Sequence, residues 1–193
     1  AFVDFNNSLL GYWRFEEGSG TTVVDSSGYG NSSYSGVLTD FGCTTTDCNA
    51  SSGRVSNGKR GKAIRFDGVT DRIITGVRNL PATNLTFEGW IYNENNVGRY
   101  LQYGEAGGNS LVSVIPSQFI IRNASGGVGD FCPTAFGSVK NWHHFALVVG
   151  PPNITAYIDG VNCGYSIFSQ IYFGTTTSSQ NLTLGAGDAV SGQ

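Results

Sequence analysis

The chain has 193 residues, of which 39% are hydrophobic, 12% aromatic and only 13% charged. This length suits a single domain with a sizeable core. The low charge leaves solubility to neutral polar residues. A net charge of −3 gives no basic patch, which argues against nucleic acid and anionic membranes as partners. No apolar run approaches the roughly 18 residues that a membrane helix needs, so no membrane span is expected.

Strand-like patterns recur along the chain, and no stretch has a sustained helical period. Apolar residues alternate with others at 85–91, 145–149 and 154–158. Turn signals such as Asp67-Gly68 and Asp159-Gly160 separate such runs. We expect about ten to twelve short strands in two packed antiparallel sheets. Residues 142–149 and 154–158 should form one hairpin, and Asp159-Gly160 a two-residue turn.

The cysteines and one atypical segment point to an oxidising compartment. Residues 40–57 are rich in Thr, Ser, Gly and Cys, and we interpret them as an inserted loop within a domain that spans residues 9–193. Four cysteines allow three disulfide pairings, with free buried thiols as the alternative. We favour a short-range disulfide, Cys43–Cys48, within the inserted loop and a longer-range disulfide, Cys132–Cys163. No Cys-x-x-Cys pair or His cluster indicates zinc.

N-glycosylation sequons are more frequent than the composition predicts. Seven Asn-x-Ser/Thr sites occur where chance gives about three. Because the sites are spread along the chain, they favour a glycosylated extracellular protein. The alternative is that the Ser/Thr/Asn-rich composition generates sequons that are not glycosylated. Because the sequence has no Met, not even an initiator, we expect Ala1 to be a cleaved or otherwise non-native start, with any signal peptide already removed. The sites are Asn6, Asn31, Asn49, Asn84, Asn123, Asn153 and Asn181.

Six motifs in chain order carry a family resemblance. They are GYWRFEEGSGTT at 11–22, VDSSGYGN at 24–31, GKAIRFDG at 61–68, LTFEGWI at 85–91, WHHFALVV at 142–149 and AYIDGV at 156–161. Together they resemble the laminin-G-like branch of the concanavalin-A-like jelly rolls, over residues 9–185. The resemblance implies an all-β, antiparallel two-sheet jelly-roll sandwich. That fold serves lectins, adhesins, enzymes and structural proteins alike.

The resemblance also implies a structural calcium ion. Similar proteins hold it with the Asp of the VDSSGYGN-like loop and the Asp of the FDG turn. These positions are Asp25 and Asp67 here, with Asn31 or nearby carbonyls as further oxygen ligands. The alternative is that Asp25 caps a turn and that Asp67 builds an Asp-Gly hairpin.

Catalysis is disfavoured, although glycoside hydrolases share the fold. Retaining enzymes need two carboxylates about 5 Å apart, which means alternate positions on a strand. No two of the five glutamates, Glu16, Glu17, Glu88, Glu94 and Glu105, are separated by one residue. The only histidines, His143 and His144, belong to the Trp-His-His strand motif.

Sugar binding would require exposed aromatic platforms beside polar groups. The resemblance assigns Trp13, Trp90 and Trp142 to the core. The tyrosines expected to be freer are Tyr29, Tyr34, Tyr100, Tyr103, Tyr165 and Tyr172, with Arg99 and Arg122 as possible polar partners.

The two ends of the chain suggest self-assembly. Relatives continue after the LTLGA strand to a closing strand, which is missing from this sequence, so an edge of the sandwich is expected to be unpaired. The extension over residues 1–8 is apolar at Ala1, Phe2, Val3 and Phe5. Strand addition between copies would give a filament, and the alternative is that the sequence is cut short before the closing strand. We therefore expect a non-catalytic, glycosylated extracellular subunit of a filament or, as the alternative, a calcium-stabilised carbohydrate-binding or adhesion module.

Overall fold

The computed structural model describes residues 9–28, 34–42, 53–78, 80, 84–104, 111–122, 128–133, 136–137, 140–150, 153–167 and 181–185. These residues contain fourteen strands in three sheets. The largest sheet has the order β1 (Thr22–Val23), β2 (Gly36–Thr39), β5 (Arg72–Thr75), β14 (Thr183–Gly185), β7 (Leu101–Tyr103), β8 (Leu111–Ile115), β9 (Gln118–Arg122) and β10 (Val128–Phe131). The four-stranded sheet has the order β13 (Val161–Ile167), β12 (Asn153–Ile158), β11 (Asn141–Gly150) and β6 (Leu85–Asn93). A small ribbon pairs β3 (Arg54–Val55) with β4 (Ala63–Ile64).

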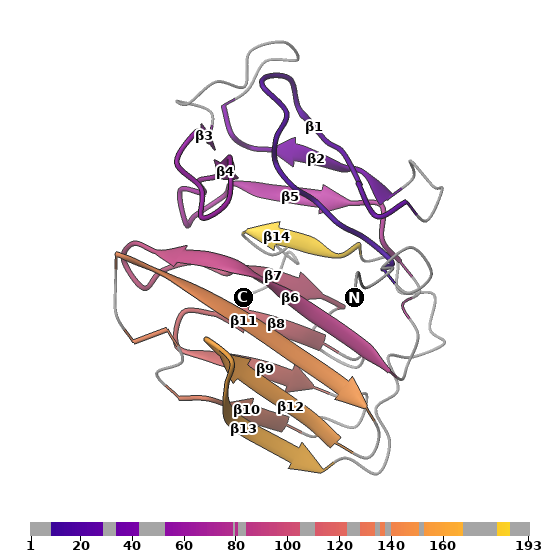
Figure 1. Ribbon diagram of the computed structural model, residues 1–193, viewed down its shortest axis with the longest axis vertical. Coiled ribbons are helices and arrows are strands. Elements are labelled where there is room, and N and C mark those ends of the chain that lie inside the picture. Colours follow the sequence, from indigo (N-terminus) through magenta and orange to yellow (C-terminus); the bar gives the residue numbers. More distant parts are fainter. Residues whose placement is uncertain are drawn as a thin grey trace, which may run out of the picture.

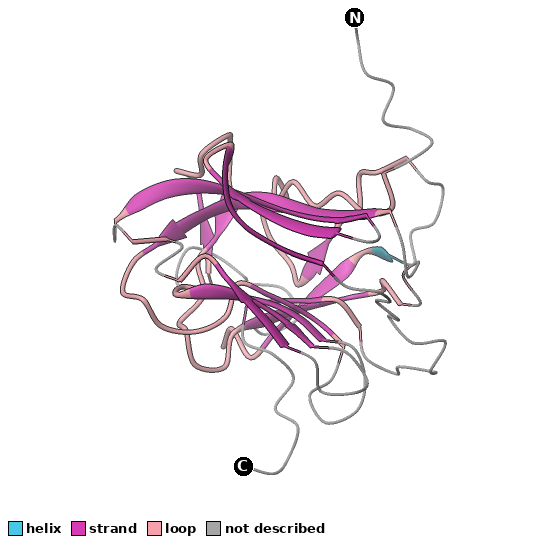
Figure 2. Ribbon diagram, turned by 90° about the horizontal axis from the view of Figure 1, so that it is seen from below, coloured by secondary structure: helices cyan, strands magenta, loops and turns pink. Residues whose placement is uncertain are grey.

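The two larger sheets form two layers, with the four-stranded sheet in front of β7 to β10 in Figure 1. The view from below in Figure 2 shows both layers of strands edge-on. Every strand pair is antiparallel. The predicted fold class, an all-β antiparallel two-sheet jelly-roll sandwich, is therefore confirmed. No helix within the described ranges is both long and apolar enough to cross a membrane.

Alternation along the strands builds the main core between the layers. On β6, Leu85, Phe87 and Ile91 point inward, and on β11 Leu147 does the same. They pack against side chains of the larger sheet such as Val114. Burying a side chain of this size stabilises the fold by about 1.5–3 kcal/mol. Each of these strands therefore has a second face that points away from the core.

A second apolar cluster lies under the β3–β4 ribbon. It contains Val23, Leu38, Phe41 and Ile73, and Trp13 packs against both clusters. β3 falls at the end of the segment 40–57 that the sequence suggested was a loop, so these two residues belong to a sheet. Residues 43–52, with Cys43 and Cys48, lie outside the described part of the chain.

The hairpins of the four-stranded sheet have the predicted arrangement. β11 pairs with β12 from Phe145↔Ile158 to Gly150↔Asn153. β12 then turns into β13 through Asp159 (φ 52°) and Gly160 (φ 79°). Two successive positive φ angles define the type I′ turn that matches the twist of a two-residue hairpin.

A disulfide joins the two sheets at one edge. Cys132 follows β10, the last strand of the eight-stranded sheet, and Cys163 lies in β13, the last strand of the four-stranded sheet. Their Cα atoms are 5.2 Å apart, and 31 positions of sequence separate them. This is the pairing favoured from the sequence, and it fastens the two layers together.

Candidate functional site

The outer face of the four-stranded sheet carries an exposed aromatic surface. Because Leu85, Phe87 and Ile91 point inward, the even-numbered residues of β6 point outward. Two of them, Trp90 and Tyr92, are each 41% exposed. On β11 the same alternation turns Trp142 and His144 outward. We call Trp90, Tyr92, Trp142 and His144 the aromatic face.

Strand register pairs these four rings directly across β6 and β11. Trp90 lies opposite His144, with ring centroids 5.1 Å apart and planes at 62°. Tyr92 lies opposite Trp142, with centroids 5.4 Å apart and planes at 60°. Edge-to-face contacts of this kind are favourable between aromatic rings. Each half-buried ring on β11 therefore braces a more exposed ring on β6, which preorganises the surface for a ligand.

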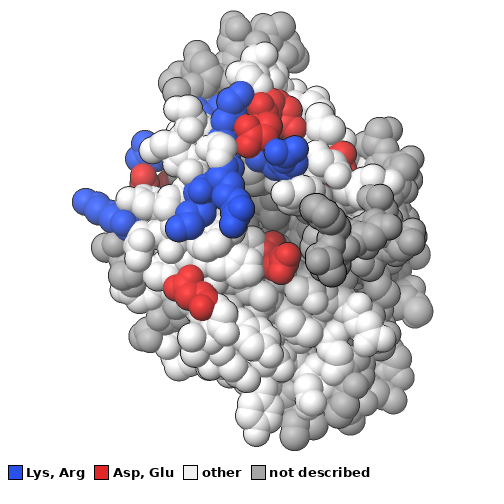
Figure 3. All heavy atoms as spheres, in the orientation of Figure 1, with Lys and Arg blue, Asp and Glu red and all other residues white. Residues whose placement is uncertain are grey.

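A basic hairpin tip borders the aromatic face, which corrects the expectation from the net charge that the protein has no basic patch. The amine of Lys59, between β3 and β4, lies 4.8 Å from the centroid of the Trp90 ring, a cation–π distance. The tip is tightly closed, with Gly58 N–H donating to Gly61 O at 2.9 Å. Figure 3 shows Lys and Arg gathered, together with a patch of Asp and Glu, over the end of the molecule that holds β3, β4 and β5, whereas the face over β11 to β13 carries little charge.

The structure corrects the expected roles of the tryptophans and tyrosines. Of the three tryptophans assigned to the core, only Trp13 packs there, and its Nε1 donates to Tyr34 O at 3.0 Å. Trp90 and Trp142 point outward instead. Conversely, Tyr103 is 4% exposed and is part of the core.

The other aromatic and cationic candidates are spread over the fold. Tyr100 packs edge-on against Phe136, and burial raises the pKa of its phenol. Tyr165, on β13, is 66% exposed. Arg122 belongs to β9 in the other sheet, and Arg99 precedes β7, where desolvation lowers the pKa of its guanidinium. Tyr29 and Tyr172 lie outside the described residues.

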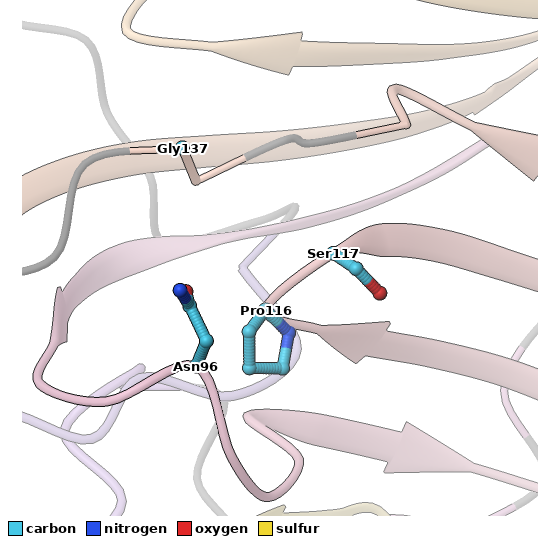
Figure 4. A pocket seen from close by; sticks show the side chains of 4 residues that line it. All are labelled: Asn96, Pro116, Ser117 and Gly137. Atoms are coloured by element: carbon cyan, nitrogen blue, oxygen red, sulfur yellow. The ribbon is translucent and has the colours of Figure 1, made fainter.

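A small hollow lies at the end of the sandwich where β6 leaves the sheet. Its volume is about 260 Å³, and Asn96, Pro116, Ser117 and Gly137 line it (Figure 4). The amide of Asn96 is already engaged, since its oxygen accepts a hydrogen bond from Asn93 Nδ2 at 2.5 Å. Ligand pockets usually exceed about 300 Å³ and have aromatic walls, so the aromatic face is the stronger candidate.

The two predicted calcium ligands are engaged in building turns. Asp25 Oδ1 accepts hydrogen bonds from the N–H groups of Tyr12 at 2.8 Å and Ser27 at 3.0 Å. Asp67 Oδ1 accepts three, from Val69 at 2.8 Å, Thr70 at 2.9 Å and Asp71 at 3.0 Å. Desolvation acts to raise the pKa of Asp67, but these backbone donors outweigh it and hold the pKa below its usual value.

Both carboxylates therefore build turns, but Asp67-Gly68 is not the expected hairpin, because β4 and β5 belong to different sheets. Lone pairs remain on both carboxylates. Asn31 lies outside the described residues. Within the described ranges, no three His, Cys, Asp or Glu side chains form a group able to hold a metal ion. Calcium binding at Asp25, Asn31 and Asp67 stays a prediction.

Three of the glutamates considered for catalysis have structural contacts. Glu16 Oε1 accepts from Lys62 N–H at 3.3 Å, and Glu17 Oε1 accepts from Val24 N–H at 2.8 Å. Glu94 forms an exposed ion pair with Arg65 at 2.9 Å. Glu88 points outward from β6 beside the aromatic face, and Glu105 lies outside the described residues.

Three of the seven sequons can be placed in the structure. Asn84 and Asn153 are exposed at strand ends. Asn181 is half-buried, and its side-chain oxygen accepts a hydrogen bond from Arg78 Nε. Asn6, Asn31, Asn49 and Asn123 lie outside the described residues, as do Ala1, Phe2, Val3 and Phe5.

Comparison with known proteins supports the fold and no closer relationship. No family model matches the chain, and no curated protein matches it. Domain 4 of AbnA, a GH43 extracellular arabinanase from Geobacillus stearothermophilus solved in complex with arabinotriose, superimposes with a TM-score of 0.53 at 19% identity, over 69% of this chain. The binding domain of Paraclostridial Mosquitocidal Protein 1 gives a TM-score of 0.56 at 13% identity, over 91% of this chain.

The match spans 66% of the arabinanase domain chain and 46% of the toxin domain chain. At these identities the similarity establishes a shared β-sandwich fold. It does not distinguish the laminin-G-like branch from other lectin-like sandwiches.

Proposed function

We propose that this protein is a non-catalytic, extracellular carbohydrate-binding module whose ligand stacks on the aromatic face. The observation that carries the proposal is the pair of exposed rings, Trp90 and Tyr92, on the outside of a rigid sheet. Residues two apart on a strand are about 7 Å from one another, so these rings offer two neighbouring platforms to an extended chain of sugars. Stacking suits sugars because it removes apolar surface from water at both partners.

Rigidity strengthens this proposal. β6 shares nine residue pairs with β11, and both strands bury their opposite face in the core. A ligand on such a surface orders little of the protein as it binds, which lowers the entropic cost. The solved structures with the same fold are consistent with a binding role, since one is a domain in complex with arabinotriose and the other a binding domain.

Affinity electrophoresis in gels that contain a panel of polysaccharides tests the proposal. For each polymer that retards the protein, Trp90→Ala and Trp142→Ala should weaken binding about tenfold each, the effect of losing about 1.4 kcal/mol of stacking. Tyr12→Ala is the matched control, because Tyr12 is also exposed but lies outside this sheet. Melting temperatures verify that the variants fold. Unchanged binding in both tryptophan variants would exclude the aromatic face as the site.

A head-to-tail filament is the second candidate. β6 has a single partner strand, β11, within the described part of the chain, and an extended segment of another copy would add to its other edge. Residues 1–5 are the donor proposed from the sequence. Light scattering and electron microscopy of native material separate the two: a monodisperse monomer that binds polysaccharide rejects the filament.

A further inference from the structure

The aromatic face has an asymmetric charge border, and this asymmetry bears on the class of its ligand. The Lys59 amine lies over the Trp90 ring, where a sugar would stack. A neutral sugar on that ring must displace the amine and loses the cation–π contact. A sugar with a carboxylate or sulfate group instead gains an ion pair with the displaced amine.

The two basic side chains of this tip form no ion pair among the described residues, although the Glu16 carboxylate lies beside the tip and accepts a hydrogen bond from Lys62 N–H at 3.3 Å. These two residues, Lys59 and Arg60, are both exposed. The carboxylate that could oppose them from the end of β6, that of Glu94, is paired with Arg65 at 2.9 Å. Lys62, in the same ribbon, donates to the backbone oxygen of Glu16 at 2.9 Å.

One acidic residue borders the aromatic face. Glu88 points outward from β6 two residues before Trp90, about 7 Å along the strand. The aromatic face is therefore positive on the side of the β3–β4 tip and negative beyond Trp90. This polarity would fix the direction of an acidic chain, with its anionic group at the basic tip.

We propose that the ligand is an acidic polysaccharide, recognised by Lys59 and Arg60 while its sugar ring stacks beside them on Trp90. This inference rests on the proposed carbohydrate-binding function and adds the substrate class. Glu88 then acts against affinity, since it repels the next anionic group of the chain. Neutralising Lys59 or Arg60 should therefore weaken binding of the polysaccharide, whereas neutralising Glu88 should strengthen it.

The experiment compares polygalacturonate, alginate and hyaluronate with carboxyl-reduced samples of the same polymers, in which each carboxylate has become an alcohol. We expect at least one acidic polymer to bind and its reduced form to bind less. Lys59→Gln and Arg60→Gln should each weaken binding to the acidic polymer about two- to fivefold, the range of exposed ion pairs. Glu88→Gln should strengthen it. Added salt should abolish these differences.

Arg78→Gln is the control, because it removes the same charge from a residue that follows β5 in the other sheet. Equal or tighter binding of the carboxyl-reduced polymers would overturn the acidic ligand and leave the carbohydrate-binding function standing. Failure to bind any polymer of either kind would overturn both. An effect of Arg78→Gln as large as that of Lys59→Gln would mean that only overall charge matters, which also rejects the proposed site.

Discussion

Nδ1 of His143 lies 2.7 Å from Oδ2 of Asp159, and Oδ1 of the same carboxylate accepts a hydrogen bond from His144 N–H at 2.8 Å. The Asp159 carboxylate thus ties the β12–β13 turn to β11, the central strand that carries half of the aromatic face. Desolvation acts to raise the pKa of Asp159, but the contacts with His143 and His144 outweigh it and lower the pKa below 3.8.

Asp159→Asn should make stability less dependent on pH in the acid range. A lowered folded-state pKa adds stability above the unfolded-state pKa, and this stability is lost as the pH falls through the folded-state value. At pH 7 the variant should therefore be less stable than the wild type, by about 1 kcal/mol or less because the carboxylate is half exposed. In urea denaturation curves the difference should shrink as the pH falls below the ordinary Asp pKa of 3.8 and through the lowered folded-state pKa.

Asn at position 159 keeps the turn, since Asn-Gly also suits a type I′ hairpin. Gly160→Ala serves as the comparison, because it strains the turn (φ 79°) and leaves the carboxylate in place. Gly160→Ala should lower stability equally at neutral and at acid pH. An Asp159→Asn difference that stays constant from neutral to acid pH would contradict the electrostatic explanation.

Arg54→Met should be strongly destabilising. Arg54 is only 6% exposed and donates to the backbone oxygens of Glu17, Gly20 and Thr22 at 3.0–3.3 Å. Without the guanidinium these acceptors are left partly buried and unpaired, at a cost of about 3 kcal/mol in the free energy of unfolding. Arg65→Met is the matched control, because the Arg65–Glu94 pair is exposed and should contribute less than about 1 kcal/mol. Equal effects in urea denaturation would show that burial does not matter here.

The sequence predicted the strands and turns well, because alternation and Asp-Gly signals are local. It placed β11, β12 and the turn at Asp159-Gly160 correctly. The same alternation also held the signal for the site: if Leu85, Phe87 and Ile91 face the core, Trp90 and Tyr92 must face away. The family resemblance instead assigns all three tryptophans to the core, and the structure contradicts it for Trp90 and Trp142.

Other parts of the candidate site depend on contacts that no local pattern encodes. The position of Lys59 over Trp90 joins residues 31 positions apart through the packing of the β3–β4 ribbon beside β6. Likewise, the pairing of Trp90 with His144 requires the register of β6 against β11. Such juxtapositions follow from tertiary packing, which periodicity in a single sequence does not specify.

Glycan occupancy should follow exposure in the folded chain. If the protein is N-glycosylated, Asn153 and Asn84 should be occupied more fully than Asn181, which is half-buried and bonded to Arg78. Glycopeptide mapping of native material measures this. The intact mass should then exceed 20.5 kDa by more than one glycan. A mass equal to that of the bare polypeptide would reject the glycoprotein proposal.

The calcium proposal predicts a melting temperature that rises with calcium and falls with chelator, because an ion that binds only the folded state stabilises it. Asp67→Asn should abolish the calcium-dependent part. It should also weaken the turn, since the amide accepts the three backbone hydrogen bonds less strongly than a carboxylate. Equal melting temperatures of the wild type in calcium and in chelator would leave Asp25 and Asp67 with a turn-building role alone.

Loss of the disulfide should loosen the edge where the sheets are joined. Replacing Cys132 and Cys163 together by Ala removes a crosslink across 31 positions of sequence. In the chain-entropy description this costs roughly 2–4 kcal/mol, because the unfolded chain regains the freedom of the loop. Urea denaturation should record the loss, and non-reducing peptide mapping of the wild type should recover the two cysteines in one linked fragment.

The aromatic face lies over β6 and β11, whereas the disulfide attaches β13, so polysaccharide binding should survive below the unfolding transition. Loss of binding while the fold is intact would mean that the Cys132–Cys163 disulfide also maintains the conformation of the aromatic face.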